Sequence, residues 1–263
     1  MSFSPATGVA STVVHTPTDG LRHGMIDLPT FDGTIAAYHA APAQGSNLPV
    51  ILVVQEIFGL HEHIQDVCRR FAHQGYLAIA VQLYQRQGDA SVYTDIPALI
   101  HDIVSRVPDT QVMADLDASV AWAARNGGDP ERVGVTGFCW GGRITWLYAA
   151  HNPSCKAGVA WYGRLVQGHG PDHVRNPVDV APELFAPVLG LYGALDTGIP
   201  VADCEAMRQK LAAGNAQAKV SEMVVYPDSG HAFYADYRPS YNAADAADAW
   251  ERALAWFSRY LKG

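Results

Sequence analysis

The sequence predicts an α/β fold in which a mainly parallel sheet carries helices on both faces and an antiparallel hairpin stands at its N-terminal edge. Continuous apolar runs alternate with helical patterns along most of the chain, and such runs are typical of strands buried on both faces. Strands that alternate with helices pair in parallel, because each helix carries the chain back across the sheet. The chain has 263 residues, of which 49% are hydrophobic, so it can fill one large core.

The expected elements begin with the hairpin. Two short β-like segments, residues 24–29 and 34–40, are separated by Asp32-Gly33, a dipeptide typical of hairpin turns. Further strands are expected from apolar runs at residues 49–54, 77–83, 132–136, 157–162, 187–192 and 220–226. Helical patterns occur at residues 63–73, 110–126, 140–152, 203–213 and 243–261. Sites in sheets of this kind lie at the carboxyl ends of the strands, so we expect the functional residues there.

No linker-like stretch interrupts the middle of the chain. We therefore expect residues 24–263 to form a single domain and residues 1–23 to be an N-terminal extension that is poorly ordered or lies on the surface. Residues 166–182 are rich in Gly, Pro, His and Asp and lack periodicity, which predicts a mobile loop over the site. An ordinary connection between two elements is the alternative for that segment.

Composition argues against several classes of protein. The formal charge is -8, from 18 basic and 26 acidic residues, and no basic cluster could follow a phosphate backbone, so no nucleic-acid partner is expected. The four cysteines form no C-x-x-C pair and have no zinc-like spacing, which argues against a disulfide framework and a structural metal site. The sequence contains neither a signal peptide nor a run long enough to span a membrane, so we predict a cytoplasmic protein without a membrane partner.

Residues 137–142 read Gly-Phe-Cys-Trp-Gly-Gly and follow directly on a predicted strand. The nucleophile elbow of α/β-hydrolases has the pattern G-x-S-x-G, in which small residues on either side of the nucleophile let the chain turn sharply from strand to helix. Gly137 and Gly141 occupy those positions around Cys139. The first amides of the following helix favour negative charge and would therefore favour a thiolate. A buried cysteine that acts only as a small apolar residue is the alternative.

A thiol nucleophile needs a base and a third group that orients the base, and α/β-hydrolases supply them in the chain order nucleophile, acid, histidine. Asp196 and His231 each follow a predicted strand and a turn, in that order. Asp228 is the alternative acid because it is close to His231 in sequence. We prefer Asp196, since a carboxylate from a separate strand end can approach the imidazole from behind.

The chain has 11 histidines, so position rather than residue type distinguishes His231. His61 and His63 form the sequence His-Glu-His, which could indicate a metal, but no third ligand stands at a recognisable spacing. We therefore expect neither a metal nor a cofactor.

Several separated motifs resemble those of the dienelactone hydrolase family, the cysteine branch of the α/β-hydrolase fold. These motifs are Val53-Val-Gln-Glu-Ile-Phe-Gly-Leu60, Leu83-Tyr-Gln-Arg-Gln-Gly88, Gly137-Phe-Cys-Trp-Gly-Gly142, Gly193-Ala-Leu-Asp196 and Gly230-His-Ala-Phe233, in the family's order. The resemblance runs from about residue 24 to the carboxyl end. It implies a hydrolase that cleaves a small lactone or ester through an acyl-enzyme intermediate on Cys139, with His231 as the base and Asp196 as its orienting acid.

The resemblance also implies a role for Glu56, in the loop after the third strand. In the family this glutamate contacts the thiol and keeps it unreactive until substrate binding shifts the carboxylate. A carboxylate beside a neutral thiol opposes its ionisation, whereas a protonated histidine and a helix N-terminus favour it, so one rearrangement can switch reactivity. The rule for this fold places the two oxyanion-binding amides on Ile57 and Trp140.

The resemblance also implies a negatively charged substrate, because the family uses arginines to bind it. The family's dienelactones carry a carboxylate held by two arginines, and Arg86 matches the first of them. A planar guanidinium suits bidentate binding of a carboxylate. Ala235 occupies the position of the second arginine, and Arg238 stands at a different offset, so we expect it to point elsewhere. A surface salt bridge is the alternative role for Arg86.

Aromatic residues crowd the predicted strand ends and could line a pocket that accepts a ring. Those expected to bind substrate are Phe58, Trp161, Tyr162 and Phe233, and Trp140 is a further pocket candidate. Core packing is the alternative for each of them.

The sequence thus predicts a cofactor-independent hydrolase of a small, anionic lactone or ester, acting as a monomer or homodimer. A broader carboxylesterase on the same scaffold is the first alternative. The second is a non-catalytic redox-sensing or ligand-binding protein, in which Cys139 is oxidised or ligated instead of acylated.

Overall fold

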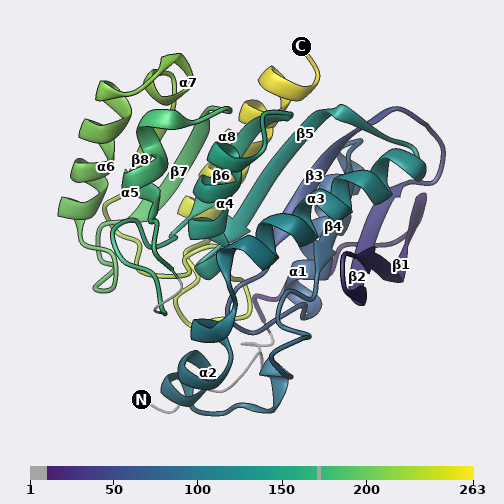
Figure 1. Cartoon of the computed structure of the whole chain (residues 1–263), viewed down its shortest axis with the longest axis horizontal. Coiled ribbons are helices and arrows are strands. Elements are labelled where there is room, and N and C mark those ends of the chain that lie inside the picture. The colour runs from purple at the N-terminus through teal and green to yellow at the C-terminus, as the bar shows by residue number, and fades with distance from the viewer. Residues whose placement is uncertain (1–10, 171–172) are drawn as a thin grey trace.

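The computed structural model describes residues 11–170 and 173–263, and these contain an eight-stranded sheet (Figure 1). The strands are β1 (Leu21–Thr30), β2 (Gly33–Pro42), β3 (Leu48–Val54), β4 (Leu77–Val81), β5 (Gly128–Phe138), β6 (Cys155–Trp161), β7 (Val188–Gly193) and β8 (Glu222–Tyr226), in the sheet order β1-β2-β4-β3-β5-β6-β7-β8. β1 pairs with β2 and β2 with β4 in antiparallel fashion, and the other pairings in this sheet are parallel. The prediction of a mainly parallel sheet with an N-terminal antiparallel hairpin is confirmed.

Helices cover both faces of this sheet. The described α-helices are α1 (Glu62–His73), α2 (Ile96–Asp102), α3 (Asp109–Arg125), α4 (Trp140–His151), α5 (Pro177–Val180), α6 (Val201–Ala213), α7 (Ala216–Lys219) and α8 (Ala243–Leu261). α1 and α8 lie together on one face, where the rings of Phe71 and Trp250 are 4.7 Å apart, and α3 and α4 lie on the other (Figure 1). None of the described helices is both long and apolar enough to cross a membrane.

Three helices, α2, α5 and α7, are additional to those that the periodicity predicts. α2 begins with Asp95 as its N-cap and has Pro97 in its first turn. An N-cap aspartate followed by proline is a signal for a helix start, so the sequence did contain the information needed for α2. α5 lies in the segment of residues 166–182 that is predicted to be a loop, and it occupies only four residues.

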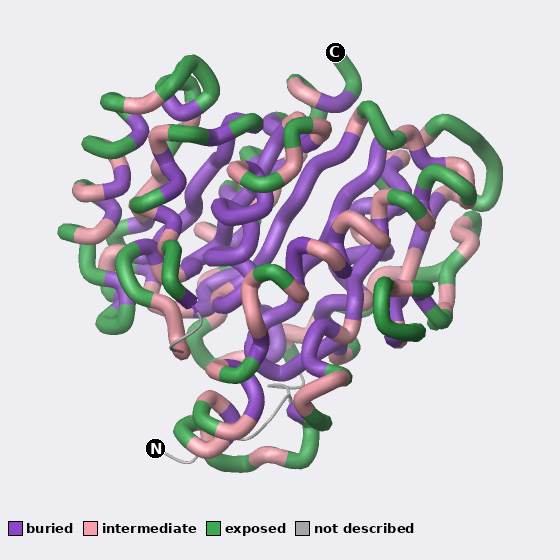
Figure 2. Tube along the Cα trace, in the orientation of Figure 1, coloured by how far each residue is buried: buried purple, intermediate pink, exposed green. Residues whose placement is uncertain are grey.

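The middle of the sheet is deeply buried (Figure 2). Every residue from Val50 to Val54 in β3 and from Leu77 to Val81 in β4 is at most 1% exposed. Burial on both faces explains why these strands are continuous apolar runs. The edge strand β1 instead alternates between exposed and less exposed residues, because only one of its faces packs on the protein.

The N-terminal segment contacts α1. The amide and hydroxyl of Thr16 donate hydrogen bonds to the carboxylate of Asp66 at 2.6 and 3.0 Å. β1 begins at Leu21, so the boundary predicted at residue 24 falls within a strand. Residues 1–10 of the predicted N-terminal extension lie outside the described residues.

The predicted site residues leave the sheet at one edge. Glu56 follows β3, Cys139 follows β5, Tyr162 follows β6, Asp196 follows β7 and His231 follows β8. Because these strands are parallel, their carboxyl ends meet at the same edge. The topology therefore gathers side chains that are far apart in the sequence.

In the turn from β5 into α4, the backbone of the first helical turn lies against the end of β5 and the residues that end β3. A Cβ atom added at Gly137 would lie 2.2 Å from the carbonyl oxygen of Gly141, and one added at Gly141 would lie 2.5 Å from the carbonyl oxygens of Val54 and Gln55. These separations are far below van der Waals contact. Only glycine therefore fits at both positions.

Gly137→Ala should lower the free energy of unfolding by about 1–3 kcal/mol, because the new methyl group overlaps backbone atoms that cannot move independently. Chemical denaturation followed by circular dichroism measures the change. Gly230→Ala is the matched control, because a Cβ atom there would meet only the carbonyl oxygen of Leu195, at 3.8 Å. Equal stability of Gly137→Ala and the parent protein would contradict the packing described here.

Candidate active site

Cys139 occupies a strained backbone position between β5 and α4. It is the N-cap of α4, with φ 54° and ψ -112°, a conformation that residues with a side chain rarely adopt. Its amide donates to the carbonyl oxygen of Trp161 at 3.0 Å, which ties the turn to the end of β6. Cys139 is partly exposed, whereas Cys68, Cys155 and Cys204 are buried. Cys139 is therefore not one more buried apolar cysteine.

The thiol, an imidazole and a carboxylate form a continuous line of hydrogen bonds. Cys139 Sγ lies 3.2 Å from His231 Nε2, and His231 Nδ1 lies 2.6 Å from Asp196 Oδ2. Asp196 is 5% exposed, and its other oxygen accepts a hydrogen bond from the amide of Gly198 at 2.8 Å, which fixes the carboxylate. Asp228 is exposed to solvent. The acid preferred from the sequence is thus the one in contact with the histidine.

This line of contacts changes the protonation of His231. Burial alone would lower the pKa of His231, but the charge of Cys139 and the hydrogen bonds with Asp196 and Cys139 raise it to about 10. The protonated imidazole is therefore favoured over a wide range of pH. Elsewhere, burial raises the pKa of the Cys155 thiol to about 12 and that of the Cys204 thiol to about 11. Those thiols stay protonated and unreactive at neutral pH.

Two backbone amides are available near the thiol. Ile57 and Trp140 both line the cavity that contains Cys139. Neither amide donates a hydrogen bond to another residue in the part of the chain that the structure describes. Trp140 is the first residue of α4, where amides have no acceptor within the helix. Both residues expected to bind an oxyanion therefore border the same cavity as the nucleophile candidate.

Glu56 is buried, with 1% exposure, and its carboxylate accepts a hydrogen bond from the hydroxyl of Tyr237. His61 Nε2 lies 3.4 Å from the same carboxylate oxygen. The family resemblance implies a contact between Glu56 and the thiol, but within the described residues the thiol is hydrogen-bonded to His231 and the carboxylate to Tyr237. The contact between Glu56 and the thiol that the resemblance implies is therefore not formed in this structure, where the Tyr237 hydroxyl binds the carboxylate.

A cavity of about 500 Å³ has Cys139, Asp196 and His231 in its lining. The remaining lining residues are Ile57, Ile96, Ile100, Trp140, Arg143, Tyr162, Arg164, His169, Thr197, Gly198, Ile199 and Arg238. A cavity of this size suits a small-molecule ligand. Its position at the carboxyl edge of the sheet agrees with the location expected from the fold.

Arg86 does not line this cavity. Its guanidinium makes paired hydrogen bonds with Asp32, at 2.7 and 2.6 Å, and with Asp115, at 2.8 and 3.1 Å. It also donates to the hydroxyl of Thr30 at 3.1 Å. Two carboxylates therefore occupy its donors and offset its charge. The structure therefore places Arg86 outside the cavity, in the salt-bridge role that was its alternative, and not at the substrate position expected from the sequence.

Of the four aromatic residues expected to bind substrate, Tyr162 is the one that lines the cavity. Trp161 and Phe233 are 0% exposed and belong to the core. Phe58 lies under the guanidinium of Arg238, whose Cζ is 5.7 Å from the ring centroid. Neighbouring residues at a strand end point to opposite sides, so a ring that is close in sequence to a candidate site residue can still face the core. For Phe58, Trp161 and Phe233 the core-packing alternative holds.

The sequence did not predict that basic residues line the cavity. These residues are Arg143, Arg164, His169 and Arg238. Arg143 follows Cys139 by four positions in α4, and residues four apart share one side of a helix, so this spacing could have placed it. His169 lies in the segment predicted to cover the site. Arg238 lines the cavity although its offset from His231 suggested that it points elsewhere, because spacing in a loop does not determine direction.

The histidines of the His-Glu-His sequence contact carboxylates. His61 lies beside Glu56, and His63 Nδ1 is 3.1 Å from Asp236 Oδ1. Among the described residues, no three side chains of metal-binding type lie close enough together to hold an ion. These histidines therefore take part in a polar network of the protein.

The sequence profile of the dienelactone hydrolase family matches residues 35–261. This chain belongs to the dienelactone hydrolase family. A relative from Escherichia coli O157:H7, provisionally named carboxymethylenebutenolidase, is 57% identical over 260 residues, which are 98% of this chain and 95% of the relative. A relative with the same name from Methylorubrum extorquens is 58% identical over 95% of this chain and 86% of its own length.

A solved structure also resembles this chain in both sequence and fold. The crystal structure of a provisionally named dienelactone hydrolase from Klebsiella pneumoniae matches with a TM-score of 0.89 and 56% identity, covering 92% of this chain and 100% of the other. The predicted family and fold are confirmed. Membership of this family indicates a hydrolase of lactones or esters.

Cys139→Ala should lower the pKa of His231 by about 1–3 pH units, because the variant removes a negative charge that raises it while Asp196 stays in place. NMR titration of the imidazole signals measures this change. Cys155→Ala is the control, because that buried thiol stands at the far end of β6 and should leave His231 unaffected. An unchanged value in Cys139→Ala would mean that no thiolate lies beside the ring.

Proposed function

We propose that this chain hydrolyses a small lactone or ester through a covalent acyl intermediate on Cys139. The hydrogen-bonded line from Cys139 through His231 to Asp196, on the wall of a cavity, carries the proposal. A thiolate beside an imidazolium is a strong nucleophile, and the same imidazole can then donate and accept protons. The names of the relatives, carboxymethylenebutenolidase and dienelactone hydrolase, support a lactone as the substrate.

In the first half of the reaction, the Cys139 thiolate attacks the carbonyl carbon of the substrate and a C–S bond forms. The carbonyl oxygen becomes an oxyanion, which the amides of Ile57 and Trp140 stabilise by hydrogen bonds. The bond between the carbonyl carbon and the ring or ester oxygen then breaks, and His231 gives its proton to that leaving oxygen. In a lactone the leaving oxygen remains attached through the opened ring.

In the second half, water attacks the thioester carbon while His231 takes one of its protons. The oxyanion forms again at the same two amides, and its collapse breaks the C–S bond. The carboxylic acid product leaves, and the thiolate beside the imidazolium is restored. Asp196 keeps the imidazole oriented throughout both halves.

We also propose that the substrate is anionic and that Arg164 binds its charge. The lining arginines differ in what they contact. Arg143 donates to both oxygens of Asp109 at 2.7 and 2.8 Å, so its charge is offset. Arg164 lines the cavity and makes no hydrogen bond or ion pair with another described residue. A guanidinium with open donors is suited to paired hydrogen bonds with a carboxylate.

The protonation of His169 supports an excess of positive charge in this part of the cavity. Burial lowers the pKa of His169, and the charges of Arg164, His173, Arg143 and His231 lower it further, to about 4. Burial disfavours a charge of either sign, but the neighbouring positive charges that disfavour an imidazolium here would favour an anion.

Cys139→Ala should abolish hydrolysis, with a loss of about a thousandfold or more, because no nucleophile remains. Cys204→Ala, which changes a buried thiol outside the cavity, should keep the parent rate. Mass spectrometry of the parent protein mixed with a slow ester should detect an acyl group on Cys139. Full activity of Cys139→Ala, with no adduct on the parent protein, would contradict the covalent mechanism and favour a ligand-binding role for the cysteine.

Arg164→Ala should lower kcat/KM for a carboxylated dienelactone by about 10-fold to 100-fold, the effect expected from losing a charged hydrogen bond. The rate on an uncharged aryl ester should stay the same. Arg86→Ala removes the same charge outside the cavity, so it should leave the ratio of the two rates unchanged. Equal losses on both substrates in Arg164→Ala would contradict the carboxylate contact and favour a carboxylesterase of broader range.

A further inference from the structure

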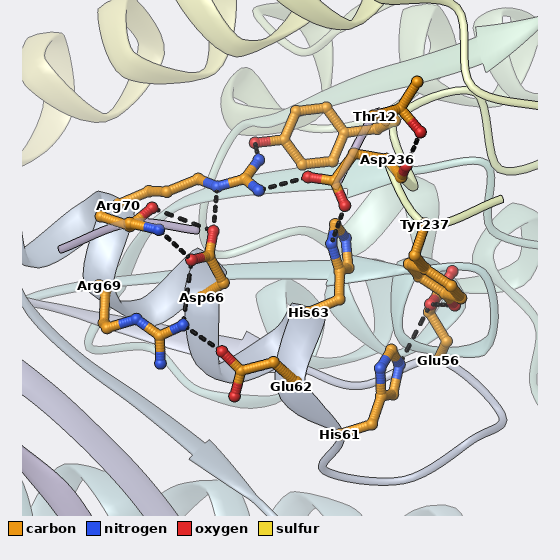
Figure 3. Close-up of polar contacts among 12 residues, drawn as sticks. Thr12, Glu56, His61, Glu62, His63, Asp66, Arg69, Arg70, Asp236 and Tyr237 are labelled. Atoms are coloured by element: carbon orange, nitrogen blue, oxygen red, sulfur yellow. Dashed lines mark hydrogen bonds and ion pairs between the residues drawn. The ribbon is translucent and has the colours of Figure 1, made fainter. Parts of the chain in front are cut away.

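A buried network of polar side chains joins two segments that flank the candidate active site (Figure 3). Glu56 and His61 belong to the segment between β3 and α1. Asp236 and Tyr237 belong to the loop between β8 and α8, which also carries His231. The network therefore links the loop that holds the catalytic histidine to the strand end that holds Glu56.

Ion pairs fasten this loop to α1. His63 Nδ1 lies 3.1 Å from Asp236 Oδ1, and Arg70 donates to Asp236 at 2.5 Å and to Asp66 at 2.6 Å. Asp66 and Asp236 are each 1% exposed, and His63 is 6% exposed. Buried charges are tolerated when they are paired and hydrogen-bonded in this way. The backbone is thereby fastened to α1 at Asp236, the residue before Tyr237, and the Tyr237 ring packs against that of His63 with centroids 5.1 Å apart.

Glu56 lies close to the nucleophile elbow. The carbonyl oxygen of Gln55, its neighbour, is 2.5 Å from the position that a Cβ atom on Gly141 would occupy, in the first turn of the helix that Cys139 caps. Burial raises the pKa of Tyr162, and the charges of both Glu56 and Cys139 raise it further, so the two groups act on one hydroxyl. A carboxylate at this location opposes formation of the thiolate if it approaches the sulfur.

Two side chains hold the carboxylate where it is. The hydroxyl of Tyr237 donates to Glu56 Oε2, and His61 Nε2 lies 3.4 Å from the same oxygen. The rings of Tyr237 and His61 meet edge to face, with centroids 5.2 Å apart. The other oxygen, Oε1, is buried and has no hydrogen-bond partner within the described residues. The orientation of the carboxylate therefore depends on the contacts of Oε2.

We propose that Tyr237 and His61 are positioning residues that hold the Glu56 carboxylate away from the Cys139 thiol, so that the thiol stays paired with His231. The proposal rests on the function proposed above, in which Cys139 is the nucleophile. When the Tyr237 hydroxyl is absent, the carboxylate is free to turn, and its negative charge disfavours the thiolate.

The charged groups around Glu56 are consistent with this role. Burial alone would raise the pKa of Glu56, but its contact with His61 and the charges of His61, His63 and Arg238 lower it to about 2. Burial and the charge of Glu56 raise the pKa of Tyr237 well above its ordinary value, so the hydroxyl remains a donor. An ionised carboxylate is thus held by a donor that does not titrate near neutral pH.

The test is the pH dependence of Cys139 alkylation by iodoacetamide, followed on the Cys139 peptide by mass spectrometry. The midpoint of the rate against pH belongs to the coupled Cys139–His231 pair. In Tyr237→Phe the midpoint should rise by about one pH unit, so the rate below it should fall about tenfold. Glu56→Gln should lower or keep the midpoint. Adding Tyr237→Phe to Glu56→Gln should cause no further change, because no carboxylate charge remains to be released.

Tyr234→Phe is the matched control, because it removes a buried hydroxyl from the same loop that contacts Arg70 rather than Glu56. It should leave the midpoint unchanged. His61→Gln gives an independent measurement and should raise the midpoint, as Tyr237→Phe does. An unchanged midpoint in both, or an equal rise from Tyr237→Phe with and without Glu56, would overturn the proposal. Absence of an acyl adduct on Cys139 would contradict the proposed function alone, since alkylation reports on the thiol and not on hydrolysis.

Discussion

The close approach of α4 to the ends of β3 and β6 is the constraint on which the site depends. The first turn of α4 starts so near the backbone of Val54 and Gln55 that no side chain fits at Gly141. The amide of Cys139 is held by the end of β6, and the residue takes a positive φ at the tip of the turn. This geometry directs the thiol out of the sheet and leaves the amide of Trp140 without an acceptor in the helix.

The loops after β7 and β8 complete the arrangement, and they are supported from outside the sheet. Asp196 is fixed by the amide of Gly198 before it contacts His231. The loop that carries His231 is fastened to α1 through Asp236 and Arg70. A small displacement of this loop would lengthen the contact between imidazole and sulfur, so ion pairs outside the cavity support the geometry of the candidate site.

The basic residues of the cavity stand at other positions than the two at which the family resemblance implies arginines. Arg86 is bound by two carboxylates outside the cavity, and the positive charges in the lining come from other segments, Arg164 and Arg238 among them. Ala235 is 0% exposed, so an arginine at that position would have to displace core atoms. The positive potential of the cavity wall is therefore a sum over cations from several segments of the chain.

The sequence by itself determined the eight strands, the five long helices and the three residues that meet at the candidate site. Apolar runs report burial directly, and Cys139 and His231 stand in local motifs of glycine and turn residues whose geometry depends on their neighbours in sequence. Only the tertiary structure decided that Arg86 turns away, that Arg164 faces the cavity and that Tyr237 holds Glu56. The direction of a long polar side chain in a loop depends on partners far away in sequence, so no local pattern specifies it.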